Sequence, residues 1–232
     1  MATPQRDRRA FFYEDFAEQF DAKMDMYDLG RRVEIVFDEL LTEDLHGRRL
    51  LDAGCGTGWF SKRACERGAL VTSLDVGEKL LAQVAKKCDS TRVVGDVLGL
   101  PFDDDQFDFV VCSEVIEHTP TPARAIRELA RVLRPNGVAV ITVPNRIWHF
   151  AIDIANLLKL RPYEGYETWL WWPELRRYID DNRLVIEDMK GFHLFPFVLP
   201  FTRGLLQRMD SQGRWLGPLM LNMAVRARKP SG

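Results

Sequence analysis

The spacing of hydrophobic residues in the N-terminal part of the chain is helical. Between residues 33 and 41 the apolar side chains fall at i, i+3, i+4, i+7 and i+8, which predicts an amphipathic helix. Phe12, Phe16 and Phe20 recur every four residues and predict an earlier helix with one apolar face. We therefore expect residues 1–44 to form an N-terminal helical cap.

From residue 45 onward the pattern alternates between short apolar runs and helical spacing. The run 107–112 is almost continuously apolar, as expected of a strand that is buried on both faces. The pattern predicts strands at 49–53, 69–75, 91–94, 107–112, 138–143, 183–190 and 218–226, and helices over 58–67, 78–87 and 121–133. This order predicts an α/β fold: a doubly wound, mostly parallel seven-stranded sheet with helices on both faces.

The chain is expected to form a single domain over residues 1–232. Its parts are the cap, a core over 45–145, a lid insertion over 146–182 and C-terminal strands over 183–232. The lid is rich in Trp and Tyr, and four of the six Trp residues lie between residues 145 and 177. These aromatic side chains either pack the lid itself or form the wall of an acceptor pocket.

Composition narrows the functional classes. Apolar residues make up 46% of the chain, charged residues 28%, and the net charge is −2. This balance is typical of a globular protein and gives no general electrostatic reason to bind nucleic acid. Residues 1–10 lack the apolar core of a secretory signal, and the four Cys residues form no C-x-x-C pair. We therefore expect a cytoplasmic protein in a reducing compartment.

A glycine-rich turn follows the first predicted strand and opens a helix. Gly54, Gly56 and Gly58 give the spacing G-x-G-x-G, with Asp52 two residues before the first glycine. Glycines allow a tight turn and close approach of a ligand to the backbone. A carboxylate at Asp52 would repel a pyrophosphate and suits a cationic ligand, although it could instead stabilise the turn.

Five segments in order resemble the Rossmann-like class I S-adenosylmethionine-dependent methyltransferases. Residues 51–58 resemble the first motif, and Asp75 ends the second strand seventeen residues after Gly58. Segments 95–97, 100–111 and 131–137 resemble the later motifs of this family. The resemblance implies the cofactor S-adenosylmethionine, with the ribose near Asp75 and the adenine near Asp96. It implies cofactor contacts from Tyr13, Asp52, Ala53, Gly54, Cys55, Gly56, Gly58, Asp75, Val76, Asp96, Val97 and Ser113.

His118 follows the fourth predicted strand and is our candidate general base, although it could instead only hydrogen-bond its loop. The spacing Glu114-x-x-Glu117-His118 resembles the ubiquinone-biosynthesis O-methyltransferases and the small-RNA 2′-O-methyltransferases. Where that pattern binds a divalent metal, His149 could be a further ligand. The same letters occur in metal-free relatives, so no metal site is predicted.

The resemblance implies methyl transfer to a small molecule, most simply to a hydroxyl oxygen of a phenol, a sugar or a lipid-linked intermediate. Two alternatives stay open: a metal-assisted RNA ribose 2′-O-methyltransferase, and a cofactor-binding partner subunit without activity. The apolar stretch 192–201 could contact a lipid substrate, a membrane surface or a second subunit, or could be buried. The sequence does not predict the oligomeric state.

Overall fold

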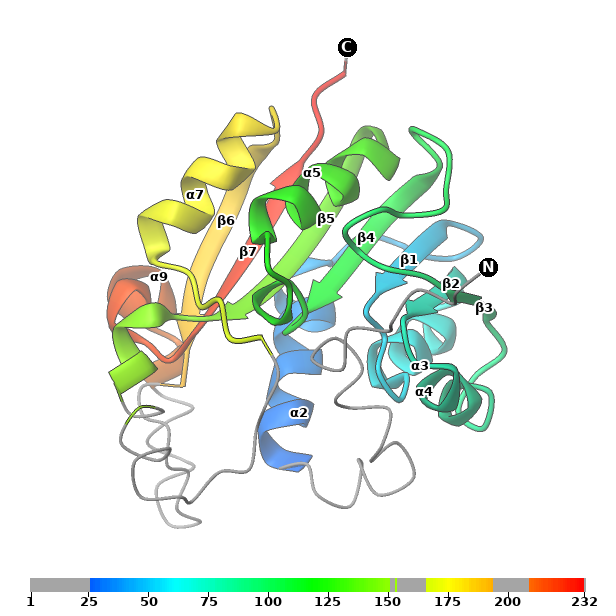
Figure 1. Cartoon of the computed structure of the whole chain (residues 1–232), viewed down its shortest axis with the longest axis horizontal. Helices are drawn as coiled ribbons and strands as arrows, with labels where there is room; N and C mark the ends of the chain where they lie inside the picture. The colour runs from blue at the N-terminus through cyan, green and yellow to red at the C-terminus, as the bar shows by residue number, and fades with distance from the viewer. Residues whose placement is uncertain (1–25, 151–152, 154–165, 194–208, 232) are drawn as a thin grey trace, which may run out of the picture.

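The computed structural model describes residues 26–150, 153, 166–193 and 209–231. Within these residues seven strands form one sheet in the order β3-β2-β1-β4-β5-β7-β6 (Figure 1). Strand β7 is antiparallel to both of its neighbours, and the other neighbouring pairs are parallel. The strands are β1 (Arg49–Ala53), β2 (Leu70–Asp75), β3 (Thr91–Val94), β4 (Phe107–Ser113), β5 (Leu133–Pro144), β6 (Val185–Phe192) and β7 (Asn222–Arg228). The predicted mostly parallel, doubly wound sheet is confirmed.

Helices cover both faces of this sheet. One face packs against α2 (Met26–Glu34), the π-helix η2 (Ile35–Leu40) and α3 (Trp59–Glu66), with α4 (Glu78–Val84) beside α3. The other face packs against α5 (Pro122–Val132) and α7 (Trp172–Asp181). The remaining short helices are η3 (Ile116–His118), η4 (Arg146–Trp148), α9 (Gly213–Leu216) and η6 (Gly217–Leu219).

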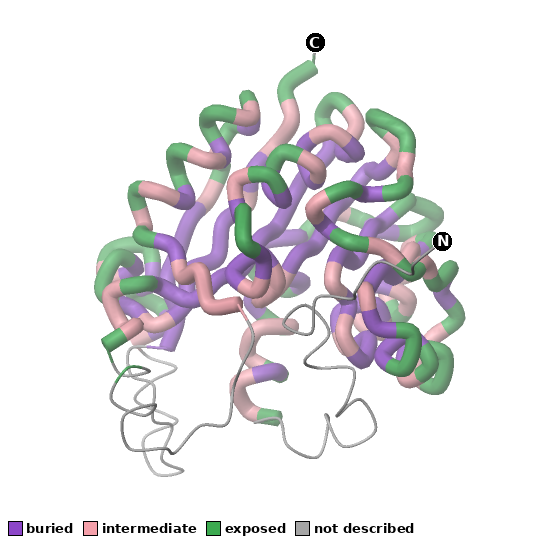
Figure 2. The backbone as a smooth tube through the Cα atoms, viewed as in Figure 1, coloured by how far each residue is buried: buried purple, intermediate pink, exposed green. Residues whose placement is uncertain are grey.

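The hydrophobic core consists of two layers, one on each face of the sheet. Figure 2 shows that the central strands are buried along most of their length. All residues of β4 except Ser113 are buried, which explains why its sequence is apolar apart from Asp108. In α5, Ile126 and Leu129 are fully buried against one face. In η2, Phe37 and Leu40 fill the other face.

Several elements differ from the sequence prediction. The last strand, expected over 218–226, is β7 at Asn222–Arg228, because residues 217–219 form the short helix η6. The segment after α2 forms a π-helix, in which Leu41 N donates to Val36 O at 2.8 Å. In an α-helix the N–H bonds to the carbonyl four residues earlier. Here it bonds to the carbonyl five residues earlier, so the turn contains one more residue than the predicted α-helical spacing. Strand β5 begins at Leu133, because Leu133 pairs with Phe107 before the Pro-Asn-Gly turn at 135–137. The expected start at residue 138 was therefore too late.

The cap and lid are described only in part. Tyr13, the Phe12–Phe16–Phe20 repeat and most of residues 151–165 lie outside the described residues. Within the expected lid, α7 packs on the sheet through Leu175 and Ile179. Of the apolar stretch 192–201, Phe192 and His193 are buried in the fold, and the rest lies outside the described residues. In the described parts, no helix is long and apolar enough to cross a membrane.

Arg67 joins the π-helix to the end of α3. Its guanidinium donates to Phe37 O at 2.5 Å, to Leu41 O at 2.7 Å and to Glu43 O at 2.6 Å. These carbonyls lie at the end of η2 and just beyond it, where helix carbonyls lack partners of their own. One side chain therefore satisfies three backbone acceptors in a partly buried position.

We expect Arg67→Met to lower the free energy of unfolding by about 2–4 kcal/mol, because three partly buried carbonyls lose charged hydrogen-bond donors. Urea unfolding of both proteins measures this change. Arg63→Met is the matched control: Arg63 lies on the same helix and makes exposed ion pairs to Asp38 and Glu66. It should change stability by no more than about 0.5 kcal/mol. Equal effects of the two substitutions would contradict the capping role.

Candidate active site

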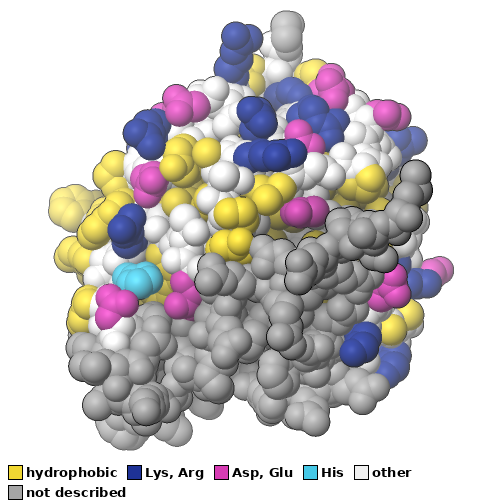
Figure 3. Space-filling view, in the orientation of Figure 1, with side chains coloured by type: hydrophobic (Ala, Val, Ile, Leu, Met, Phe, Trp, Pro, Cys, Tyr) yellow, Lys and Arg dark blue, Asp and Glu magenta, His cyan; other side chains and the backbone are white. Residues whose placement is uncertain are grey.

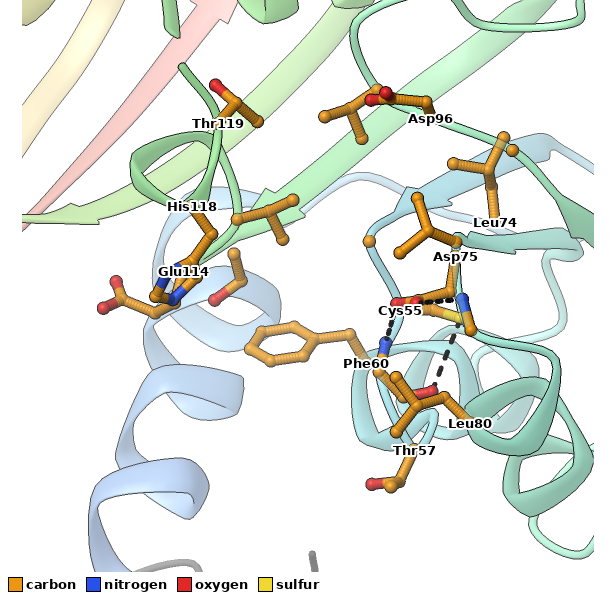
Figure 4. Close-up of a pocket in the computed structure, with 18 of the residues that line it drawn as sticks. Cys55, Thr57, Phe60, Leu74, Asp75, Leu80, Asp96, Glu114, His118 and Thr119 are labelled. Carbon is orange, nitrogen blue, oxygen red and sulfur yellow. Dashed lines mark hydrogen bonds between the residues drawn. The ribbon is translucent and has the colours of Figure 1, made fainter. Parts of the chain in front are cut away.

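A cavity of about 360 Å³ lies at the carboxyl ends of β1, β2, β3 and β4. The strand order reverses between β1 and β4, and open sheets of this kind bind ligands at such a reversal. In Figure 4 one end of the cavity is formed by Cys55 and Asp75, and the other by Glu114 and His118. The cavity brings together the predicted residues Gly54, Cys55, Gly56, Asp75, Val76, Asp96, Val97, Ser113 and His118.

The glycine turn after β1 forms the floor of this cavity. Gly54, Gly56 and Gly58 all have positive φ, at 77°, 52° and 90°. A Cβ on Gly54 would lie 2.4 Å from the Val115 side chain, so a larger residue does not fit. Gly54 N and Cys55 N both donate to Leu74 O, at 2.8 and 2.9 Å. The turn is therefore fixed to the end of β2.

Asp75 holds two backbone segments together at the end of β2. Its Oδ2 accepts from Gly56 N at 2.9 Å, and its Oδ1 accepts from Gly77 N at 3.0 Å (Figure 4). The carboxylate is 8% exposed and lines the cavity. One carboxylate at the cavity wall thus accepts hydrogen bonds from both the glycine turn and the start of α4.

Asp96 follows β3 at the exposed part of the cavity. Its Oδ1 accepts from Leu98 N at 2.8 Å, and its backbone carbonyl accepts from Gly99 N at 3.0 Å. These bonds form a tight turn that presents Asp96 and the buried Val97 to the cavity. Asp75 and Asp96 therefore give this end of the cavity an acidic character.

Three predicted residues do not line the cavity: Asp52, Ala53 and Gly58. Asp52 is 2% exposed and lies beneath the turn, where it accepts from Ser61 Oγ of α3 at 2.6 Å. Ser61 continues the chain of hydrogen bonds to Ser73 Oγ at 2.7 Å. Burial raises the pKa of Asp52 to about 7, and the Ser61 hydrogen bond opposes this rise. In the structure, Asp52 anchors the turn from below.

The opposite end of the cavity is formed by the segment after β4. Glu114 has a φ of 54°, a conformation that non-glycine residues rarely adopt, and its Oε1 accepts from Thr142 Oγ1 at 2.9 Å. Thr142 Oγ1 also lies 2.8 Å from Ser113 Oγ. Burial raises the pKa of Glu114, and burial together with Glu114 raises the pKa of Glu117 well above its usual value.

Arg32 of α2 lines the same end of the cavity and is not among the residues predicted from the sequence. Its Nη2 donates to Asp28 Oδ2 at 2.5 Å, while its Nε is buried and has no hydrogen-bond partner among the described residues. Of the described residues that line the cavity, Arg32 is the only Lys or Arg. No motif marks it, because α2 reaches the cavity only through packing on the sheet.

His118 is oriented by a backbone carbonyl. Its Nδ1 lies 3.0 Å from Tyr166 O, and a carbonyl can only accept, so Nδ1 carries a proton and the neutral form of the ring is the Nδ1–H tautomer. In that tautomer Nε2 has the lone pair that can accept a proton. Tyr166 belongs to the expected lid, so the lid contributes to the site through its backbone.

The structure does not assemble a metal site from the Glu114-x-x-Glu117-His118 pattern. Among the described residues, no group of three or more His, Cys, Asp or Glu side chains is placed to hold an ion. His118 Nε2 lies 3.9 Å from Glu117 Oε1. His149 instead pairs with Asp153 at 3.2 Å and packs edge-on against Trp169.

Comparisons with known proteins identify the family. Residues 51–141 match the family model described as a methyltransferase domain. The chain is 31% identical over 172 residues to the ubiquinone biosynthesis O-methyltransferase of Aeromonas salmonicida (strain A449), covering 69% of this chain and 72% of that protein. Over 179 residues it is 30% identical to the protein of the same name from Pasteurella multocida (strain Pm70), covering 68% of this chain and 74% of that one.

Solved structures share the fold at lower identity. The [4+2]-cyclase SpnF superposes with a TM-score of 0.71 at 19% identity, covering 100% of this chain and 98% of SpnF. Magnesium protoporphyrin IX methyltransferase from Synechocystis PCC 6803 with bound SAM superposes with a TM-score of 0.66 at 17% identity, covering 98% of this chain and 100% of that one. The chain belongs to the class I S-adenosylmethionine-dependent methyltransferases and is an enzyme that uses this cofactor.

We expect the buried Asp52 carboxyl to make stability depend on pH. Its pKa is about 7 in the folded chain, above the value of about 3.9 expected in the unfolded chain, so the protonated form favours folding. That stability is fully present below about pH 4 and is lost as the pH rises through 7. Between pH 6 and pH 8 the wild type should lose about 1 kcal/mol relative to Asp52→Asn.

Urea unfolding at pH 6 and pH 8 measures this difference. Asp103→Asn, which changes an exposed carboxylate, should follow the wild type at both pH values. The quantity to compare is the difference in free energy of unfolding between the wild type and Asp52→Asn. If this difference is the same at pH 8 as at pH 6, Asp52 is ionised throughout this range.

Proposed function

We propose that this methyltransferase transfers the methyl group to a hydroxyl oxygen of a small-molecule acceptor, with His118 as the general base. The observation that carries the proposal is that one cavity connects the acidic end at Asp75 with the end formed by His118, Glu114 and Arg32. The cofactor would occupy the first end and the acceptor the second. Their reacting atoms would then meet near Ser113 and Val115 at the end of β4.

The residues at the acidic end are suited to S-adenosylmethionine. The positive-φ glycine turn leaves space beside the backbone at Gly56, where an added Cβ would have no heavy atom within 4 Å. Asp75 lies at the end of β2, where a carboxylate suits the ribose hydroxyls, and Asp96 follows β3 on the adenine side. The two carboxylates also favour a cationic ligand over a pyrophosphate. Tyr13 remains a proposed contact that lies outside the described residues.

When bound, the cofactor supplies an activated methyl group on a sulfonium. The protein then has to align the acceptor oxygen and remove its proton. We assign the proton to His118 Nε2, because Nδ1 is engaged by Tyr166 O. We assign Arg32 to the acceptor oxygens, because its unpartnered Nε is a buried donor on a cavity-lining side chain.

The acceptor we propose is a phenol. The relatives from Aeromonas salmonicida and Pasteurella multocida carry the name ubiquinone biosynthesis O-methyltransferase, which supports a hydroxyl acceptor. The apolar side chains of Leu29 and Phe60, which also line the cavity, suit a flat, largely apolar molecule. A polar end with Arg32, Glu114 and His118 would then orient its hydroxyl group.

No observation in the described residues favours an RNA acceptor. The cavity lining contains Asp75, Asp96 and Glu114 against one arginine, so it does not offer the basic groove that a phosphate backbone requires. On the face shown in Figure 3, Lys and Arg side chains lie among Asp and Glu side chains over the described part of the surface. We therefore place the acceptor among small molecules.

The first test is calorimetric titration of the full chain with S-adenosylmethionine and with S-adenosylhomocysteine, each with EDTA and with Mg²⁺. We expect both to bind, with equal affinity in the two buffers. Asp75→Asn should weaken S-adenosylhomocysteine binding roughly 10- to 100-fold, because charge-assisted hydrogen bonds to the ribose are lost. Asp103→Asn, far from the cavity lining, should bind as the wild type does. A folded wild type that binds neither compound would refute the placement of the cofactor.

The second test concerns His118. We expect His118→Gln to lower kcat roughly 10²- to 10⁴-fold while S-adenosylhomocysteine affinity stays within a factor of about two, because the ring acts on the acceptor's proton. Turnover would be measured on catechol and 3,4-dihydroxybenzoate. His149→Gln is the control, since His149 does not line the cavity. If kcat is unchanged in His118→Gln, the histidine only supports its loop.

A further inference from the structure

Two cysteines lie near each other at the ends of α3 and α4 that point away from the glycine turn. Cys65 is on the last turn of α3, and Cys88 is one turn beyond the end of α4, where its N–H donates to Val84 O at 3.1 Å. The proposed methyl transfer uses neither residue, and neither lines the cavity. Both thiols are free and partly exposed, whereas Cys55 and Cys112 are buried.

Two observations place Cys65 beside the segment that contains Cys88. Cys65 Sγ lies 3.6 Å from the carbonyl oxygen of Asp89, the residue that follows Cys88. The Cys88 side chain is near enough to contribute to the raised pKa of Cys65, and Cys88 packs against the cluster of Cys55, Leu81 and Val84. The two thiols therefore connect the end of α3 with the segment that follows α4.

We propose that Cys65 and Cys88 form a reversible disulfide that braces α3 against α4 at the ends that point away from the glycine turn. The pair is a modification site for a small-molecule disulfide such as oxidised glutathione. This proposal concerns the thiols alone and does not depend on the assignment of acceptor or base.

The reaction balances as two thiol–disulfide exchanges. The Cys88 thiolate attacks one sulfur of oxidised glutathione, whose S–S bond breaks, and one glutathione leaves as its thiolate. Cys65 then attacks the Cys88 sulfur of the mixed disulfide and releases the second glutathione. The two protons lost by the cysteines are taken up by the two glutathione thiolates, so the cysteines are oxidised and glutathione is reduced.

The environment of Cys65 explains why Cys88 reacts first. Burial raises the pKa of the Cys65 thiol to about 12, and the charge of Cys88 and its hydrogen bond act in the same direction. A thiol with such a pKa is a poor attacking group while it is reduced. Once Cys88 carries glutathione, it has neither a thiolate charge nor an S–H group, so its contribution to the shift disappears and Cys65 becomes a better nucleophile.

The position of the pair connects it to the turn that forms the cavity floor. Lys87, the residue before Cys88, donates from Nζ to Thr57 O at 2.9 Å and lies 5.3 Å from the centre of the Trp59 ring. Gly58, at the start of α3, packs so closely on Val84 of α4 that an added Cβ would lie 2.9 Å from that side chain. A disulfide between residues 65 and 88 would join α3 to the segment after α4 covalently, at the end of the α3–α4 contact that lies away from the glycine turn.

The experiment incubates the full chain with mixtures of oxidised and reduced glutathione, blocks free thiols with N-ethylmaleimide and maps tryptic peptides without reduction. Trypsin places Cys65 in residues 64–67, Cys88 in 88–92 and Cys55 in 50–62. We expect a 64–67/88–92 linkage, a mass loss of about 2 Da and a melting temperature raised by roughly 5 °C. The number of titratable thiols should fall from four to two, since the chain has four Cys.

Three results would overturn the proposal: glutathione that remains on Cys88 beside a free Cys65, a 50–62/88–92 linkage, or four free thiols at every ratio. Cys65→Ala should leave Cys88 as a mixed disulfide with glutathione. Cys112→Ala, which changes a buried thiol of β4, should keep the 64–67/88–92 linkage. The mapping of the wild-type chain decides the question even if a variant folds poorly.

Discussion

The site depends on the reversal of strand order between β1 and β4. Because β1 continues to β2 and β3 on one side while β4 continues to β5 on the other, the segments after these strands diverge and leave a crevice. The glycine turn lies on the β1 side of this crevice, where it forms the floor of the cavity, and the Ser113–Glu114 segment lies on the β4 side. The parallel register makes four strands end at the same edge, so residues far apart in sequence face a single cavity.

Buried polar groups keep this crevice in shape. Asp52 and the hydroxyls of Ser61, Ser73 and Ser90 form a continuous hydrogen-bonded chain from β1 through α3 to the residue before β3. Asp75 ties the turn to the start of α4 through two backbone N–H groups. Each buried polar atom in these contacts has a partner, as the cost of desolvation requires. The floor of the cavity is therefore rigid, and its chemistry is decided by the side chains at its two ends.

The fold alone does not decide that chemistry, since SpnF, a [4+2]-cyclase, has the same architecture. In our proposal the chemistry is decided by the end of the cavity that Arg32, Glu114 and His118 line. The sequence marked His118 and Glu114, because both follow a recognisable buried strand. Arg32 could not be found in this way, because it comes from a helix outside every motif and reaches the cavity only when α2 packs on the sheet.

The sequence by itself determined the strands of the sheet, the helices α3, α4 and α5, and the glycine turn, because alternating periods and a G-x-G-x-G spacing are local properties of the chain. The resemblance to the methyltransferase family also implied cofactor contacts from residues at or after the ends of β1, β2, β3 and β4. Only the tertiary structure decided that Asp52 supports the turn from below, that Tyr166 orients His118, and that Cys65 lies near Cys88. These contacts join segments that are distant in sequence. Packing of the whole chain decides which residues meet, and a local sequence pattern does not predict this.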